Sequence, residues 1–285
     1  MSNLFMAGLR RYFYNPVWWV SVVASIVFGV FLGDYFYREN TTDPSIYFIP
    51  QMIFAILISL TVAREMSGSA FRNKIVAGYS KGQIFFAELL LAVGACVLLF
   101  LIYFVAFALF CIPTLSKLPA AMGGDVFLGF LMIAVSTAAL CYAVAMLSPR
   151  RTLGAVLCIL AVIGMAVAAE NIHYRLLQKE YVLDIQVVEN PETGRPETVV
   201  GGRIPNPRYV DGTKRTVYEL LEKLNPAGQG EVYNEIIDTQ LHPDTSGETL
   251  EVSIGRVRFY PLISLGVMLT VSGLGCLFWR RKNIR

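Results

Sequence analysis

The sequence predicts an α-helical polytopic membrane protein with six transmembrane helices and one polar domain outside the membrane. Hydrophobic residues make up 55% of the chain and charged residues only 16%, and the mean hydropathy is +0.55. A soluble domain usually carries about 25% charged residues. The deficit is uneven, because long stretches carry no charge whereas residues 170–258 have the composition of a soluble sequence. Membrane spans combined with one exposed domain account for this division.

Six apolar segments are long enough to cross a membrane. A helix needs roughly 20 residues to span a hydrocarbon layer of about 30 Å. The segments cover approximately residues 17–33, 46–63, 83–112, 126–147, 153–169 and 259–279. The third is longer than required, so we expect it to tilt or to protrude from the membrane.

Basic residues in the short loops predict which side of the membrane each loop faces. Lys and Arg concentrate in the cytoplasmic loops of membrane proteins. Here they gather before the first span, between spans two and three, between spans four and five, and after span six: Arg10, Arg11, Arg64, Arg72, Lys74, Lys81, Arg150, Arg151, Arg280, Arg281, Lys282 and Arg285. The alternate short loops hold only Arg38 and Lys117. Both termini are therefore expected in the cytoplasm, with residues 170–258 outside.

The chain divides into three regions on this basis. Residues 1–169 hold spans one to five, and residues 259–285 hold span six and a basic cytoplasmic tail. The first fifteen residues show apolar side chains near helical spacing around Arg10 and Arg11: Leu4, Phe5, Leu9, Tyr12 and Phe13. This pattern is typical of a helix in the membrane interface; a frayed terminus is an equal alternative.

The polar region, residues 170–258, predicts a small extracellular α+β domain. It has 15 acidic and 10 basic side chains, a net charge of −5. Alternating apolar residues predict strands at Leu183–Val187, Thr198–Val200 and Leu250–Ile254. Helical spacing predicts one helix with Val217, Leu220, Leu221 and Leu224, ended by Asn225–Pro226, and a second with Tyr233, Ile236, Ile237 and Leu241. We expect these elements to share one modest core, completed by the membrane ends of the spans or by a second copy.

A cytoplasmic segment between spans two and three carries more signals than a plain connector requires. Ser69 can cap a helix that Gly78 ends. Ser80 with Gln83 three residues later fits a capping box that opens span three. Phe71 and Ile75 lie one turn apart, which makes a small apolar face. Residues 69–79 are therefore predicted to form a short amphipathic helix, and a solvated basic loop is the alternative.

This segment resembles the permease subunits of the type-2 ABC exporter family. The similarity rests on Arg64–Glu65, Gly68, Phe71–Arg72–Asn73–Lys74–Ile75, Gly78–Tyr79–Ser80–Lys81 and Ile84–Phe85. At residue level it covers about residues 64–90, while the order of the predicted elements follows the family plan along the whole chain. The resemblance implies a coupling helix at 69–79 that docks onto a separate ATPase subunit. It implies these coupling residues: Glu65, Phe71, Arg72, Asn73, Lys74, Ile75, Gly78 and Tyr79.

In this interpretation, Phe71 and Ile75 fill a groove on the ATPase while Arg72 and Lys74 meet acidic groups at the rim of that groove. The resemblance also implies a homodimer of this chain with two ATPase subunits, in the bacterial cytoplasmic membrane. ATP and Mg would bind to the ATPase, so no cofactor is expected here. A pathway between the copies would be lined by spans one, two and five, with Tyr47, Gln51, Phe54 and Met165 as lining residues; ordinary helix-packing or lipid-facing positions are the alternative for each of these residues.

The sequence contains no familiar motif for nucleotide binding, catalysis or metal binding. Gly-x-x-x-x-Gly-Lys-Ser/Thr does not occur, so the chain is not expected to bind ATP or to be an enzyme. His173 and His242 are the only histidines, which predicts no metal site. The sequence also lacks a basic stripe of the kind that would indicate a nucleic-acid partner. Glu88 is the one ionisable residue clearly inside a span, and it is expected either to contact a basic residue of the coupling segment or to snorkel to the surface.

The function that these features favour is a permease subunit that exports an amphipathic substrate such as a peptide, a lipid or a hydrophobic drug. The alternative is a non-transporting membrane scaffold or sensor whose external domain binds a ligand or regulates an envelope enzyme. An integral-membrane enzyme would need polar groups clustered at one interface, and the sequence shows no convincing cluster of that kind. Binding of an ATPase to Phe71–Tyr79 separates the first two functions.

Overall fold

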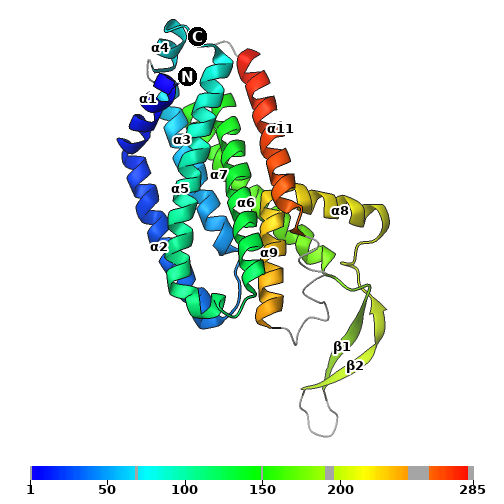
Figure 1. The fold of residues 1–285 in the computed structure, drawn as a ribbon. Coiled ribbons are helices and arrows are strands. Elements are labelled where there is room, and N and C mark those ends of the chain that lie inside the picture. Colours follow the sequence, from blue (N-terminus) through cyan, green and yellow to red (C-terminus); the bar gives the residue numbers. More distant parts are fainter. Residues whose placement is uncertain (1, 68–69, 149, 190–195, 243–256, 282–285) are drawn as a thin grey trace.

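The computed structural model describes residues 2–67, 70–148, 150–189, 196–242 and 257–281. Six of the described helices are long and apolar enough to cross a membrane: α2 (Pro16–Glu39), α3 (Ser45–Ser67), α5 (Lys81–Leu115), α6 (Ala120–Leu147), α7 (Arg151–Leu176) and α11 (Tyr260–Arg281). They run side by side as one bundle (Figure 1). The prediction of a polytopic α-helical membrane protein with six spans is confirmed.

Local sequence signals set the ends of several spans. The Asn15 side chain caps α2 by accepting a hydrogen bond from the Val17 amide, and α2 ends at Asn40 in the left-handed region with φ 52°. Ser80 and Gln83 form the predicted capping box at the start of α5. Near its other end, α5 departs from helical geometry at Cys111, because Pro113 cannot continue a regular helix.

The two most buried spans, α3 and α6, occupy the centre of the bundle. Both α3 and α11 pack against α6, α3 also packs against α7, and α2 packs chiefly against α5. The outer spans α2, α7 and α11 leave broad apolar faces exposed. Such faces are suited to contact with lipid chains or with another copy of the chain.

One end of the bundle collects α1 (Ser2–Phe13), α4 (Ala70–Val76) and the last turn of α11 (Figure 1). The N-terminal segment is therefore a helix, as one alternative predicted. The short helix predicted at 69–79 is present as α4, and Gly78 with φ 88° follows it as the predicted stop. Ser69, the predicted cap, lies outside the described residues.

At the opposite end, the region between α7 and α11 contains two of the three predicted strands and both predicted helices. β1 (Tyr181–Glu189) and β2 (Pro196–Pro205) pair as an antiparallel hairpin that projects from the bundle (Figure 1). α8 (Gly212–Leu224) and α9 (Pro226–Leu241) follow and are separated by Asn225, as predicted. The strand predicted at Leu250–Ile254 lies outside the described residues.

Among the described elements of this region, α9 carries most of the buried side chains, and the spans complete its core, which is one of the two options predicted. α9 packs against α3, α6, α7 and α8, and its side chains are buried on nearly every side. The apolar face of α8 is instead 44% to 55% exposed: Val217, Leu220, Leu221 and Leu224. α9 directs its apolar side chains mainly towards the spans, so within the described residues it covers the apolar face of α8 only in part.

Glycines permit the close approach of α9 to its neighbours. A Cβ atom on Gly129 of α6 would lie 2.2 Å from the ring of Tyr233, which is 1% exposed. A Cβ atom on Gly230 would lie 2.7 Å from the ring of Tyr47 on α3. Both glycines therefore provide the space in which a buried aromatic ring lies.

Hydrogen bonds also hold α9 in the bundle. The Tyr47 hydroxyl donates to Glu231 Oε1 at 2.7 Å, and Ser264 of α11 donates to Gln229 Oε1 at 2.6 Å. Burial raises the pKa of the Glu231 carboxyl above its ordinary value, and the hydrogen bond from Tyr47 acts in the opposite direction. Glu231 and Gln229 of α9 thus find hydrogen-bond partners inside the bundle, as most buried polar groups do.

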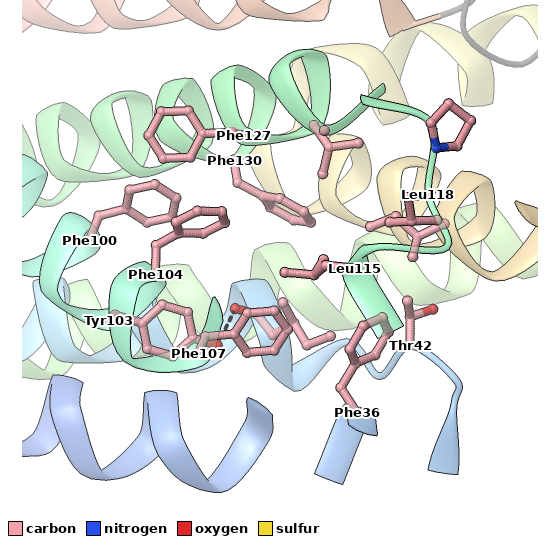
Figure 2. A pocket seen from close by; sticks show the side chains of 15 residues that line it. Phe36, Thr42, Phe100, Tyr103, Phe104, Phe107, Leu115, Leu118, Phe127 and Phe130 are labelled. Carbon is pink, nitrogen blue, oxygen red and sulfur yellow. Dashed lines mark hydrogen bonds between the residues drawn. The ribbon is translucent and has the colours of Figure 1, made fainter. Parts of the chain in front are cut away.

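An apolar cavity of about 190 Å³ lies between α5 and α6, close to the connection between these two helices. Aromatic rings from α2, α5 and α6 form much of its wall (Figure 2).

We expect Gly129→Ala to lower the stability of the protein, because the Tyr233 ring has no room to move away from the new methyl group. Overpacking of this kind typically costs about 1–3 kcal/mol. Gly124→Ala is the matched control in the same helix, since no atom lies within 4 Å of a Cβ at that position. Thermal unfolding in detergent micelles compares the two variants. Equal unfolding temperatures would contradict the packing of α9 into the bundle.

Candidate functional site

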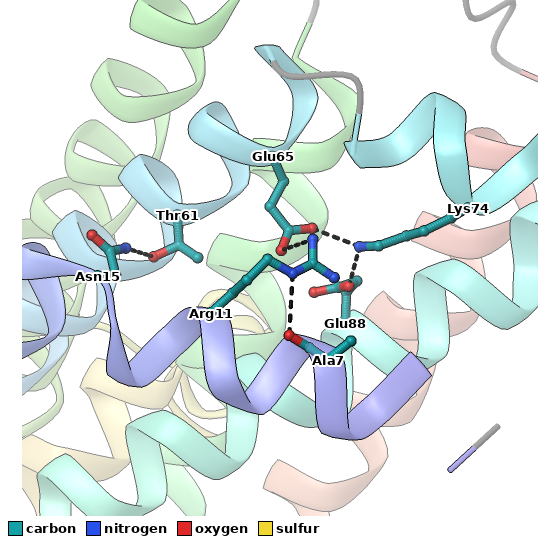
Figure 3. A network of polar contacts seen from close by, with 7 residues as sticks. All are labelled: Ala7, Arg11, Asn15, Thr61, Glu65, Lys74 and Glu88. Atoms are coloured by element: carbon teal, nitrogen blue, oxygen red, sulfur yellow. Dashed lines mark hydrogen bonds and ion pairs between the residues drawn. The ribbon is translucent and has the colours of Figure 1, made fainter. Parts of the chain in front are cut away.

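Buried charges fix α4 to the spans. The Lys74 ammonium group donates to Glu65 Oε2 of α3 at 2.9 Å and also contacts Glu88 Oε1 of α5 (Figure 3). The side chains of Lys74, Glu65 and Glu88 are only 7%, 10% and 5% exposed. One cation therefore bridges two spans. Of the two expectations for Glu88, contact with a basic residue of the coupling segment is confirmed.

The N-terminal helix α1 joins the same cluster. Arg11 Nη1 lies 3.4 Å from Glu65 Oε1, and Arg11 Nε donates to the Ala7 carbonyl at 3.2 Å. At the end of α1, the Asn15 side-chain amide donates to the Thr61 hydroxyl of α3 at 3.3 Å. Figure 3 shows these contacts converging from α1, α3, α4 and α5.

The charges of this cluster balance formally. Arg11 and Lys74 supply two positive charges, and Glu65 and Glu88 supply two negative charges. Removing ions from water is costly, and a buried pair repays that cost only when its partners stay in place. The cluster is consequently a geometric constraint: displacing α4 from the bundle would leave two carboxylates without the Lys74 ammonium group.

Aromatic contacts hold α4 from a second direction. The ring of Phe71 packs edge-to-face on Trp279 of α11, with centroids 5.3 Å apart. The Lys74 ammonium group lies 5.2 Å from the centroid of the Phe71 ring. Phe71 and Trp279 are 5% and 1% exposed. α4 thereby contacts three different spans through only two of its side chains.

Phe71 and Lys74 do not occupy the surface positions that the sequence interpretation assigned to them. Both side chains point into the protein, because the apolar face of α4 packs onto the bundle. Neither is available in this structure to enter a groove, or to meet the rim of one, on a partner. Glu65 is likewise buried, while Ile75 and Tyr79 are half-buried.

The outward face of α4 is made by Arg72, Asn73 and Val76, which are exposed. The sequence interpretation included Arg72 and Asn73 but missed Val76, an apolar side chain that is 81% exposed. Helical spacing alone could have identified it, because Val76 does not lie on the same helix face as Phe71 and Ile75. Gly78 is also exposed, just beyond the helix. We call Arg72, Asn73 and Val76 the outer face of α4.

The predicted pathway residues lie inside a single copy of the chain. Tyr47, Gln51 and Phe54 of α3 are 3%, 1% and 1% exposed, because α3 is enclosed by other helices. Their expected position between two copies is therefore wrong for this conformation. Met165 of α7 is half-buried, and its carbonyl accepts a hydrogen bond from the Asn225 side chain at 2.8 Å.

A second polar contact lies at the hairpin end of the bundle. His173 Nδ1 is 2.8 Å from Glu222 Oε1, and His173 Nε2 is 3.7 Å from Glu235 Oε2. Sequence reasoning did not pair these residues, since the fold brings them together from α7, α8 and α9. Among the described residues, no group of three His, Cys, Asp or Glu side chains is placed to hold a metal ion.

Replacing Lys74 by Met should destabilise the protein strongly, because Glu65 and Glu88 would remain buried with one cation fewer. Loss of one partner from a buried ion pair typically costs about 3–5 kcal/mol. The double variant Lys74→Met/Glu88→Gln should regain most of this loss, since Arg11 and Glu65 still balance. The exposed Arg72→Met is the control and should shift stability by less than about 0.5 kcal/mol. Thermal unfolding in detergent distinguishes the three; a Lys74→Met variant as stable as the parent chain would refute the cluster.

Comparison with known proteins does not assign a family, so the interpretation of the site rests on its geometry. No protein-family model and no curated protein matches this chain. What stands is a six-span helical membrane protein in which one short helix, exposed on one face, is bound to three spans by buried charges and aromatic rings.

Proposed function

We propose that this chain is the permease subunit of an ATP-driven exporter, and that α4 transmits the movement of a separate ATPase subunit to the spans. The bridge from Lys74 to Glu65 and Glu88 carries this proposal. It ties α4 to α3 and α5 at once, so a force on α4 would reach both spans. A connector that only joins two spans needs no buried cation between two carboxylates.

The outer face of α4 supports docking of a soluble partner. Arg72, Asn73 and Val76 project from a helix whose other face is anchored in the bundle. Arginine is enriched at protein interfaces, and an exposed apolar side chain adds area that a partner can bury. The nature of the partner comes from the resemblance of residues 64–90 to type-2 ABC exporter permeases. ATP and Mg would be bound by that partner.

The orientation follows from the positive-inside rule applied to the fold. α1 with Arg10 and Arg11, α4 with Arg72, and the last turn of α11 with Arg280 and Arg281 lie at the same end of the bundle (Figure 1). Lys and Arg mark the cytoplasmic side. We therefore place both termini in the cytoplasm of a bacterium, and the hairpin and α8 at the outer side of its cytoplasmic membrane, with α9 packed among the spans on that side.

We further propose a homodimer of this chain with two ATPase subunits. The apolar faces that α2, α7 and α11 leave exposed provide surface for a second copy. A pathway between the copies would export an amphipathic peptide, lipid or hydrophobic drug. In the described conformation, such a pathway would not be lined by Tyr47, Gln51 and Phe54, which other helices cover.

One observation favours the alternative function, a scaffold or sensor. The projecting hairpin exposes apolar side chains that no described element covers: Tyr181 at 51%, Leu183 at 54% and Ile204 at 43%. A ligand or an envelope protein that bound there would bury them. This alternative requires no ATPase at the outer face of α4, so the experiment on α4 separates the two functions.

Single cysteines should report the orientation. All five native cysteines are buried, so a variant in which they are replaced by serine or alanine is a suitable background. In whole cells, a membrane-impermeant maleimide should label Gly202→Cys on β2, whereas Val76→Cys should react only after lysis. Both positions are exposed, so access to solvent is matched. Labelling of Val76→Cys before lysis would reverse the orientation.

Introducing negative charge on the outer face of α4 should release the ATPase. Arg72→Glu, and separately Val76→Asp, should lower the amount of ATPase that co-purifies with the affinity-tagged chain from its native membranes. Loss of an interface anchor typically costs about 2 kcal/mol, roughly a thirtyfold weaker Kd. Arg203→Glu on β2 makes the same charge change at the other end of the molecule and should have no effect.

Measurements of unfolding temperature show whether a variant loses the ATPase because its binding surface has changed or because the chain has unfolded. Both α4 variants should unfold at the temperature of the parent chain, because their side chains are exposed. A purified parent chain without an ATPase, or capture that is unchanged in both α4 variants, would remove the exporter proposal.

A further inference from the structure

The cavity between α5 and α6 has two walls of aromatic side chains. Phe100, Phe104 and Phe107 lie on one face of α5, and Gly123, Phe127 and Phe130 lie on one face of α6 (Figure 2). Both sets follow the spacing that places residues on a single side of a helix. The cavity is therefore part of the helix-packing pattern of the fold, and the sequence maintains an apolar wall along several turns.

The side chains that line the cavity are almost all apolar. Thr42 and Tyr103 are its only side chains with a polar group, and both groups have partners. Thr42 Oγ1 donates to the Asn234 carbonyl at 3.1 Å, and the Tyr103 hydroxyl donates to the Ile46 carbonyl at 2.9 Å. A bound water needs two to four polar partners, and the side chains of this wall offer few. The wall therefore favours an apolar occupant.

The dimensions of the cavity indicate a chain rather than a compact ring system. Its lining on α5 extends from Phe100 to Leu115, about 22 Å of helix at a rise of 1.5 Å per residue. The cavity volume is only about 190 Å³. A cavity of this small volume that extends along such a length is narrow, and it fits an extended hydrocarbon chain better than a compact ring system. Protein interiors rarely keep large voids, and apolar cavities of about 150 Å³ stay dry and bind small hydrocarbons.

The mouth of the cavity lies where α5 connects to α6. Pro119 and Gly123 are exposed, whereas Phe100, Phe130 and Ile237 at other parts of the wall are buried. We propose that the cavity binds one hydrocarbon chain, whose polar end remains outside beside Pro119 and Gly123. The chain comes either from a membrane phospholipid or from the tail of a free amphiphile. This site does not depend on the role of α4.

Photolabelling tests the site in the purified full chain, reconstituted in lipid nanodiscs without any partner. Two probes are used: a long-chain fatty acid with a diazirine in its chain, and a phosphatidylcholine with the same diazirine in one acyl chain. Mass spectrometry of the digested protein locates the adducts. We expect adducts on the cavity walls within residues 100–107 and 123–130.

A matched pair of glycine variants decides whether the label enters the cavity. A Cβ atom has open space at both Gly123 and Gly124, but only Gly123 lines the cavity. Gly123→Phe should fill the mouth and lower labelling of residues 100–107 at least tenfold. Gly124→Phe should leave labelling unchanged. Val126→Trp, which fills the cavity from another lining position, serves as a second blocking variant if Gly123→Phe does not fold.

The pattern of labelling also identifies the source of the chain. Labelling by the fatty acid alone, blocked in the filled variant, supports a free amphiphile. Labelling by the phosphatidylcholine alone, blocked in the same way, supports a membrane lipid. Equal labelling of Gly123→Phe, Gly124→Phe and the parent chain, or adducts confined to residues outside the cavity walls, would overturn the proposal. Because no ATPase is present, failure of the exporter proposal does not affect this result.

Discussion

The position of the cytoplasm-facing segment in our proposal depends on one ammonium group. Lys74 extends from a helix of seven residues and meets carboxylates from two different spans. A helix this short has little stability of its own in water. Its conformation is maintained by what its side chains contact, namely Glu65, Glu88 and the Trp279 ring. The same contacts orient its outer face, so the fold of α4 and the partner binding that we propose for it have a common origin.

The sequence predicted the elements far better than their contacts. Long apolar runs, the capping box at Ser80 and the stop at Gly78 are local signals, and local signals identify helices and their ends. The bridge among Glu65, Lys74 and Glu88 joins three helices, so only one of its contacts was anticipated and only as an alternative. Phe71 was assigned to the wrong side of α4, because an apolar face does not reveal whether it packs on its own chain or on a partner.

The polar region shows the same limit at a larger scale. Alternation and helical spacing correctly predicted β1, β2, α8 and α9. They offered completion of the core by the spans as one of two options, but they did not predict that nearly all of α9 is buried among α3, α6 and α7, because that burial depends on contacts between segments far apart in the sequence. The features that permit its entry are the absence of side chains at Gly129 and Gly230, together with hydrogen-bond partners on α3 and α11. Such complementarity is visible only in three dimensions.

The buried position of α9 has a consequence for the order of assembly. With 16 residues it is about 24 Å long, shorter than a hydrocarbon layer of about 30 Å. It also carries Gln229, Glu231, Asn234 and Asp238, which are costly to place in lipid alone. α9 therefore cannot insert as an independent segment. It must dock after α3, α6 and α7 have formed its walls, and α11 can supply the hydrogen bond from Ser264 only once the last span is in place. Completion of the bundle thus waits for the C-terminal part of the chain.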